Sequence, residues 1–257
     1  MVGRASALLS SRRIVGFVAL AAALGVYYAV HEELWNASLW WDVAFLAFLL
    51  IPAVFGLVWF ALPFWRSPPL QLLVAAIAFI ALAVILQAAG AHTPANFAKL
   101  AAMSAVGWLF LHYFEEASWV VLVALIIPWV DAYSVWRGPT KHIVTHHEHT
   151  FTLLSFAFPV PGETGAAKLG LPDLMFFALF LAAADRFRLR VGWTWVCLTA
   201  SVGTTMALAT WTDVGGLPAL PLLSLGFLLP NADLLWRLVR KPRPAEPRAG
   251  SDPGRVR

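Results

Sequence analysis

The chain has 257 residues, of which 60% are hydrophobic and 12% are charged, and its mean hydropathy is +0.75. Soluble domains carry about 25% charged residues, so this composition excludes a soluble globular protein and indicates helices that face lipid. The net charge of +4 comes mainly from clusters at the ends of apolar segments, which indicates membrane topology and not nucleic acid binding. The single cysteine, Cys197, excludes an intramolecular disulfide.

Eight apolar segments are long enough to cross a bilayer, which takes about 20 helical residues. They predict an all-α, polytopic transmembrane helical bundle with about eight spans, nine being the alternative. About three spans fall in an N-terminal part (1–96) and the others in a membrane domain (97–238), and residues 239–257 are expected to form a disordered cytoplasmic tail. The segments are Ile14–Val30, Trp41–Phe64, Leu70–Ala89, Phe97–Phe114, Ala117–Trp136, Leu171–Phe187, Val191–Ala209 and Leu217–Leu238.

Arginines and lysines indicate which short loops stay in the cytoplasm. With the N-terminus inside, most of them fall in the cytoplasm, and the exceptions are Arg137, Lys141 and Lys168. We therefore expect a multi-pass protein of a prokaryotic cytoplasmic membrane with both termini cytoplasmic. The first segment also fits a signal peptide, but no small-residue cleavage site follows it, which favours a retained anchor.

An ionisable group within an apolar segment is costly and indicates a functional site, and two carboxylates stand out. Asp131 comes shortly before the end of the fifth segment, and Asp173 lies in the first turn of the sixth. Consecutive spans are antiparallel, so the end of one and the start of the next share a membrane face. At about 1.5 Å per helical residue both carboxylates lie at a similar depth, and they can meet.

Two neighbouring carboxylates in a low-dielectric site favour a state in which one keeps a proton and the other is charged. The charged carboxylate can take a proton from a water that attacks a peptide carbonyl, while the protonated one donates to the carbonyl oxygen. This chemistry is hydrolysis of a peptide bond. The alternative, which spacing alone leaves open, is that one aspartate is a helix cap and the other is partnered by Arg137 or Lys168.

A proline-rich segment, Gly215-Gly216-Leu217-Pro218-Ala219-Leu220-Pro221, opens the eighth span. Prolines leave backbone groups without helical partners, which is tolerated at this depth only beside protein or a watery cavity. Such a non-helical start can pair with an extended substrate backbone. A simple proline-rich helix start is the alternative.

Taken in order, these three elements resemble the presenilin and signal peptide peptidase family of intramembrane aspartyl proteases, including its short microbial members. Lys168-Leu169-Gly170-Leu171-Pro172-Asp173 looks like the start of the family's G-x-G-D segment, residues 217–221 look like its P-A-L motif, and Asp131 takes the place of the Y-D aspartate. The resemblance covers roughly residues 97–238. It implies that Asp131 and Asp173 are the catalytic pair and that the substrate-binding residues are Gly170, Leu171, Pro172, Pro218, Ala219 and Leu220.

The chain departs from the family pattern at two positions beside the aspartates. Val130 stands where the family usually has tyrosine, and Pro172 stands where it has glycine. Proline suits the first turn of a helix, but it removes a backbone donor and fixes φ. About three spans also precede Phe97, where the family typically has four.

The predicted orientation places the loop between the aspartate helices outside, as in the signal peptide peptidase branch. That resemblance implies substrates that are single-span membrane proteins, or leader or signal peptide remnants, with their amino ends in the cytoplasm. The expected partners are these substrates and membrane lipid, with no nucleic acid and no cofactor, and the sequence does not indicate an oligomeric state. Two rival interpretations use the same aspartates. One is a non-enzymatic protein, either an ion- or proton-coupled transporter or an inactive relative. The other is a prepilin-peptidase-like enzyme, which would not explain the Pro218 motif.

The connection between the aspartate spans holds two further features. Its histidines and Glu148 have a spacing that can hold a metal, but no cysteine joins them, so a solvated or interfacial loop is favoured and no metal is expected. The apolar stretch Phe151–Pro161 is too short to span and is expected at the interface or over the aspartates, with a lid or a substrate-pairing strand as a possible role. The histidines are His142, His146, His147 and His149.

Overall fold

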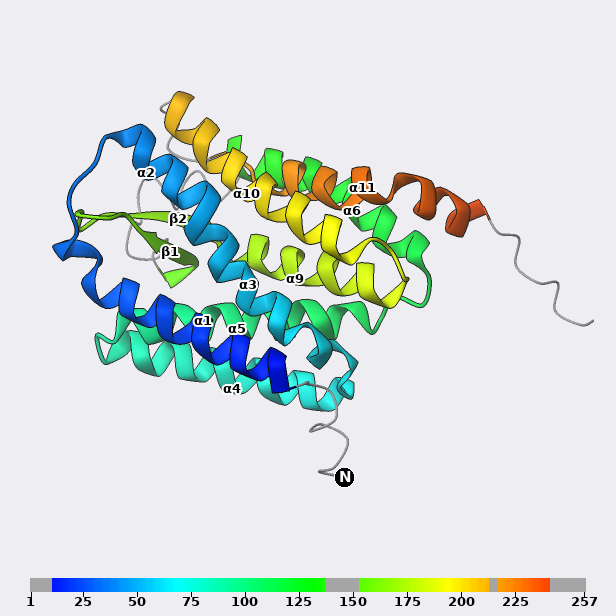
Figure 1. Ribbon diagram of the computed structural model, residues 1–257. Helices are drawn as coiled ribbons and strands as arrows, with labels where there is room; N and C mark the ends of the chain where they lie inside the picture. The colour runs from blue at the N-terminus through cyan, green and yellow to red at the C-terminus, as the bar shows by residue number, and fades with distance from the viewer. Residues whose placement is uncertain (1–10, 137–152, 213–216, 241–257) are drawn as a thin grey trace, which may run out of the picture.

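The computed structural model describes residues 11–136, 153–212 and 217–240, and 81% of these residues are helical. Each predicted apolar segment contains a helix or a continuous run of helical turns (Figure 1). The mostly helical architecture is therefore confirmed. The elements are α1 (Ser11–Val30), η2 (His31–Glu33), α2 (Leu39–Phe45), η3 (Leu46–Leu50), α3 (Ile51–Ala61), η4 (Leu62–Arg66), α4 (Pro69–Ala88), α5 (His92–Leu111), α6 (Ala117–Trp136), β1 (Ser155–Pro159), β2 (Ala166–Gly170), α9 (Leu171–Arg186), α10 (Val191–Thr212) and α11 (Leu220–Arg240).

Six helical stretches among the described residues are long and apolar enough to cross a membrane. This set is consistent with the all-α membrane bundle that the composition indicates. Two helices lie outside it, namely α5, which carries Lys99, and α9, which has 16 residues. The six stretches are Ser11–Glu33, Leu39–Arg66, Pro69–Ala88, Ala117–Val135, Val191–Thr212 and Leu220–Val239.

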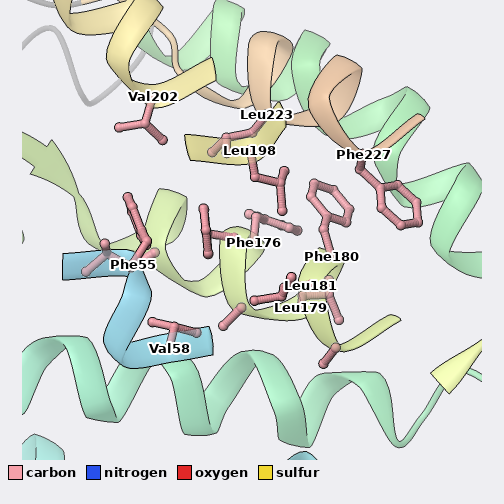
Figure 2. Packing of buried hydrophobic residues seen from close by; sticks show 14 of the residues in the cluster. Phe55, Val58, Phe176, Leu179, Phe180, Leu181, Leu198, Val202, Leu223 and Phe227 are labelled. Atoms are coloured by element: carbon pink, nitrogen blue, oxygen red, sulfur yellow. The ribbon is translucent and has the colours of Figure 1, made fainter. Parts of the chain in front are cut away.

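Helix α9 is the centre of the bundle. It contacts α5, α6, α10 and α11, and every residue from Phe176 to Ala184 is buried. Phe55 of α3 stacks on Phe177 with ring centroids 3.8 Å apart. Phe227 of α11 stacks on Phe180 at 4.9 Å (Figure 2). Because packing on all sides holds α9 in place, the position of its first turn is well defined.

Helix α5 approaches α9 closely at Gly107. A Cβ at this position would collide with the backbone carbonyl of Met175 and would lie 3.1 Å from the backbone nitrogen of Leu179. Small residues at such crossings let helix backbones pack against each other in membranes, where van der Waals contact drives association. Glycine at position 107 is therefore required for this packing.

A two-stranded antiparallel hairpin, β1 with β2, lies between α6 and α9 in the chain. Ser155 pairs with Gly170 and Pro159 pairs with Ala166. β1 falls within the apolar stretch Phe151–Pro161, for which a strand was one expected role, whereas β2 was not predicted. Since Gly170 ends β2 and the next residue begins α9, the hairpin leads directly into the helix that carries Asp173.

Two of the helix boundaries that differ from the predicted segments bear on the domain division and on the site. Helix α5 begins at His92 and not at Phe97, so the expected division between residues 96 and 97 falls inside a helix. Helix α11 begins at Leu220, because Pro221 is tolerated in a first turn and not deeper in a helix. The segment at Pro218 is non-helical, as the sequence indicates.

Candidate active site

Asp173 lies in the first turn of α9, where the end of the hairpin determines its surroundings. Gly170 is the last residue of β2 and the N-cap of α9, and its N–H donates to the half-buried Asp173 carboxylate. A carboxylate at the third helical position that reaches back to the N-cap is one half of a capping box. A Cβ on Gly170 would lie 3.1 Å from Asp173 Oδ2, so glycine leaves room for this carboxylate.

Pro172 takes the second position of α9. The first four N–H groups of a helix have no intrahelical partner, so proline here removes no helical hydrogen bond, and its fixed φ suits the first turn. Proline at this position is therefore compatible with the helix. Because proline fixes φ, Pro172 restricts the backbone conformation immediately before Asp173.

Asp131 of α6 reaches the start of α11. Its Oδ2 accepts a hydrogen bond of 3.0 Å from the N–H of Leu220, which is the first residue of α11. Ala219 and Leu220 are each 3% exposed, so this end of the proline-rich segment is buried next to the carboxylate. Val130, the residue before Asp131, is 54% exposed.

The carboxylates of Asp131 and Asp173 lie close enough for their charges to act directly on each other. Within the described ranges, the salt bridges involve other carboxylates, and no lysine or arginine pairs with either aspartate; Arg137 lies outside those ranges. Instead, each carboxylate faces the N-terminus of a helix, where the backbone N–H groups and the helix dipole favour negative charge. The backbone N–H groups of Gly170 and Leu220 thus stabilise negative charge on the two carboxylates.

Side chains from two helices cover the outer edge of β1, opposite to β2. Asn96 of α5 donates from Nδ2 to the carbonyl of Ala157 at 2.7 Å and accepts the N–H of Ala157 at 3.0 Å. The hydroxyl of Tyr28 on α1 donates to the same carbonyl at 2.9 Å. Asn96 is 5% exposed, so one buried amide forms the backbone hydrogen bonds that a neighbouring strand would otherwise form.

Two further side chains extend this arrangement along β1. The Tyr27 hydroxyl donates to the carbonyl of Pro159 at 2.7 Å, and Lys99 Nζ donates to the carbonyl of Ser155 at 3.1 Å. Alternate residues of an antiparallel strand direct their backbone groups away from the partner strand, so all these bonds lie on the edge opposite to β2. We call the four side chains the β1 clamp: Tyr27, Tyr28, Asn96 and Lys99.

The β1 clamp was not identified from the sequence. The available signal was Asn96 and Lys99, two polar residues on one face of an otherwise apolar helix, since buried polar groups in such helices need partners. Their partner strand is distant along the chain, so the sequence did not reveal what they bind.

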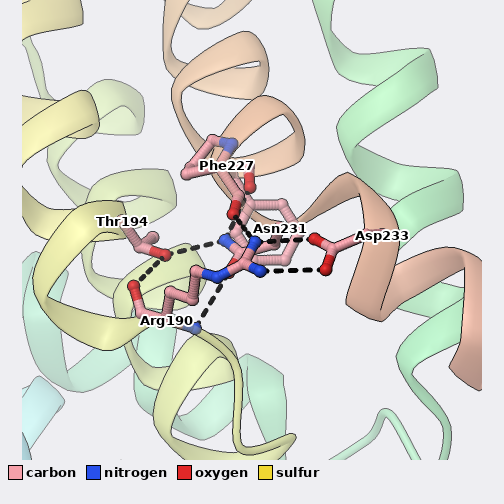
Figure 3. Close-up of polar contacts among 6 residues, drawn as sticks. Arg190, Thr194, Phe227, Asn231 and Asp233 are labelled. Carbon is pink, nitrogen blue, oxygen red and sulfur yellow. Dashed lines mark hydrogen bonds and ion pairs between the residues drawn. The ribbon is translucent and has the colours of Figure 1, made fainter.

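A second polar cluster lies at the opposite end of the bundle, between α10 and α11 (Figure 3). Arg190 forms two hydrogen bonds with the Asp233 carboxylate, at 2.6 and 2.9 Å. Asn231 donates to Thr194 Oγ1 at 2.7 Å and to the Phe227 carbonyl at 2.8 Å, and it accepts the N–H of Arg190 at 2.9 Å. These groups satisfy one another, so the cluster joins two helices and is structural.

The predicted histidine-rich loop lies outside the described residues. In the part of the chain that the structure describes, no three histidine, cysteine, aspartate or glutamate side chains form a group that could hold a metal ion. The interpretation of the loop residues stays a prediction for His142, His146, His147, Glu148 and His149.

Comparisons with family models, with curated proteins and with solved structures found no match to this chain. The site is therefore characterised by the geometry of its residues and by the sequence motifs in which they lie.

Proposed function

We propose that the chain is an intramembrane aspartyl protease of the presenilin and signal peptide peptidase type, with Asp131 and Asp173 as its catalytic pair. One observation supports this most strongly: Asp131 binds the backbone of Leu220 on α11, and its helix α6 contacts α9, which carries Asp173. The three segments that carry the motif resemblance, which are far apart in the sequence, thus meet at one place.

In the proposed reaction, the two carboxylates share one proton, because both cannot be charged at low cost in a low-dielectric site. The charged carboxylate takes a proton from a water, whose oxygen attacks the carbonyl carbon of the peptide bond. The protonated carboxylate donates to the carbonyl oxygen. Collapse of the resulting intermediate breaks the C–N bond, and the nitrogen receives a proton as the amine leaves.

The proposed substrate lies as an extended chain beside β2 and the segment before α11. The β1 clamp occupies the outer edge of β1, which leaves β2 as the strand next to the aspartates. Strand-like pairing of this kind gives affinity through backbone hydrogen bonds. The residues proposed to shape this site are Gly170, Leu171, Pro172, Pro218, Ala219 and Leu220.

The proposed topology has eight spans, including α5 and α9, with both termini in the cytoplasm of a prokaryotic cell. The hairpin and the aspartates are then near the outer face, and substrates are single-span proteins or leader remnants with cytoplasmic amino ends. A reporter fused after Gly138 tests this orientation. A reporter that stays cytoplasmic would contradict it.

One observation favours a second candidate, a non-enzymatic relative or a transporter that uses the same aspartates. Each carboxylate accepts a backbone N–H at a helix N-terminus, and such capping contributes to stability without any catalysis. In this alternative, replacing an aspartate destabilises the protein and no cleavage activity exists to be lost.

The deciding experiment expresses the protein together with a panel of single-span reporters in cells. Wild type is compared with Asp131→Ala and Asp173→Ala, and Asp233→Ala serves as the control because it removes a carboxylate from the opposite end of the bundle. We expect a reporter that is cleaved by wild type and the control and by neither site variant. Equal cleavage in all four strains, or cleavage in none with every reporter tried, would remove the protease proposal.

A further inference from the structure

An open apolar groove of about 600 Å³ runs along the outside of the bundle, away from the aspartates. Its floor is α3, and α1 and α10 form its two walls. It is lined by Leu20, Gly56, Trp59, Phe60, Gly192 and Trp193, among others. The groove lies near the start of α1, the end of α3 and the start of α10. These helix ends together form the arginine-rich end of the bundle.

Small residues keep this groove open. A Cβ on Gly192 would meet no atom within 4 Å, so the space beside it is empty of protein. Trp59 packs edge-on against Trp195 with ring centroids 5.9 Å apart, and Trp195 Nε1 donates to the Phe55 carbonyl at 3.2 Å. The indole N–H of Trp195 is thus hydrogen-bonded within the protein, and the surface of the groove is apolar.

Basic side chains stand at the end of the groove. Gly16 packs against the ring of Phe60, and on α1 the residues Arg12, Gly16 and Leu20 share one face because they are four positions apart. Arg12 is therefore one turn beyond Gly16 and about two turns beyond Leu20, the α1 residue that lines the groove. On the other wall, the exposed Arg188 precedes Gly192 in the turn before α10.

These basic groups differ from the other arginines at the same end. Arg66 pairs with Asp185, Arg190 pairs with Asp233, and Arg186 donates to a backbone carbonyl. Within the described ranges, no hydrogen-bond or ion-pair partner is found for the side chain of Arg12, Arg13 or Arg188. Near this end of the apolar groove, no carboxylate among the described residues pairs with the positive charge of these side chains.

We propose that this groove binds an anionic phospholipid, with one acyl chain between α1 and α10 and the phosphate beside Arg12 and Arg188. Basic residues at this level of a membrane attract anionic headgroups, and tryptophans such as Trp193 favour the headgroup region. A membrane-spanning helix about 10 Å wide and about 30 Å long would fill several times the volume of the groove. An acyl chain therefore fits this space better than a partner helix does.

The test measures lipid binding to the purified full-length protein by native mass spectrometry. The probes are phosphatidylglycerol, phosphatidylcholine with the same acyl chains, and inorganic phosphate. We expect phosphatidylglycerol to bind more tightly than phosphatidylcholine, and phosphate alone not to be retained. Equal affinity for the two lipids, or retention of phosphate without lipid, would overturn the proposal.

Matched variants separate the two parts of the site. Gly192→Leu fills the groove and should weaken both lipids, whereas Gly25→Leu, at an equally open position of α1 that does not line the groove, should not. Arg12→Gln and Arg188→Gln should each weaken phosphatidylglycerol roughly fivefold and leave phosphatidylcholine unchanged, whereas Arg237→Gln on α11 should change neither.

Circular dichroism confirms that each variant is folded before lipid binding is compared. Lipid binding that Gly192→Leu leaves intact would contradict the proposed position of the acyl chain. A dimer of the chain that Gly192→Leu dissociates would show that protein, and not lipid, occupies the groove. The measurement needs no protease activity, so it can fail or succeed independently of the proposed function.

Discussion

The two ends of the bundle hold their carboxylates in different ways. At the arginine-rich end, Asp185 accepts hydrogen bonds from Trp65 and Arg66, each at 2.7 Å, and Asp233 binds Arg190. At the hairpin end, Asp131 and Asp173 are held by backbone N–H groups and by no described lysine or arginine.

This difference separates carboxylates that hold helices together from carboxylates that are suited to chemistry. A carboxylate bound to arginine stays charged, and removing one partner of such a pair chiefly costs stability. Two neighbouring carboxylates at helix N-termini can instead share a proton, which an acid and base pair requires. A carboxylate without an oppositely charged partner breaks the usual pairing rule, and such exceptions are expected at functional sites.

The strongest test of this difference replaces each aspartate by its isosteric amide. Asp131→Asn and Asp173→Asn should each lower the cleavage rate by at least about 10²-fold, because an amide cannot exchange the required proton. Asp233→Asn should leave the rate of the folded protein unchanged. Initial rates with equal amounts of folded protein measure this, and a similar loss in all three variants would show that the two ends do not differ.

A second prediction concerns the β1 clamp, which positions the hairpin that leads into Asp173. Asn96→Asp should lower cleavage roughly tenfold at neutral pH, equivalent to about 1.4 kcal/mol in the barrier, since a charged carboxylate cannot donate to the Ala157 carbonyl. At acidic pH the introduced carboxyl is protonated and regains a donor, so the ratio of variant to wild-type rate should rise.

The matched control for this pH profile is Asn231→Asp, which makes the same chemical change at the opposite end. Its rate ratio to wild type should not depend on pH as long as the protein remains folded. A ratio for Asn96→Asp that is equally flat would mean that the amide of Asn96 does not position the site.

A third prediction addresses stability at the arginine-rich end. Asn231→Ala removes the buried amide that binds Thr194 and the Phe227 carbonyl, and it should lower the free energy of unfolding by about 2 kcal/mol. Thermal unfolding in detergent measures this change. Cleavage well below the unfolding temperature should keep its rate and its cut site, and a shifted cut site would show that this cluster influences catalysis.

The smallest effect is expected for Pro172→Gly, which introduces beside Asp173 the glycine of the family that the sequence resembles. Glycine should lower the free energy of unfolding by about 0.5–1 kcal/mol through the greater freedom of the unfolded chain. No helical hydrogen bond depends on position 172, so the cleavage rate should change less than about threefold, a range that corresponds to under 1 kcal/mol in the barrier. A much larger rise in rate would show that proline restricts the site.

Much of the helical arrangement could be predicted because it follows from local composition. The segment that contains Asp131 begins and ends at the predicted residues Ala117 and Trp136, since charged residues flank a continuous apolar run. The approach of Asp131 to Asp173 follows from two consecutive antiparallel helices. Both results need only the period and length of a helix.

The remaining features depend on contacts between distant segments. The hydrogen bond from Leu220 to Asp131 and the pairing of Asn96 with Ala157 join residues 89 and 61 positions apart. Neither β2 nor the β1 clamp has a local pattern that indicates its partner, because a buried amide binds any backbone that tertiary packing brings to it. Such pairs follow from the packed structure and not from propensity.

The most direct test of the central claim follows the oxygen of water into the product. The purified protein in liposomes is given a single-span peptide substrate in water enriched in heavy oxygen, and the new carboxyl terminus is examined by mass spectrometry. We expect one heavy oxygen in that carboxyl with wild-type protein, and no product with Asp131→Asn or Asp173→Asn. Labelled product formed at the wild-type rate by either variant would contradict the claim that these two aspartates activate the water.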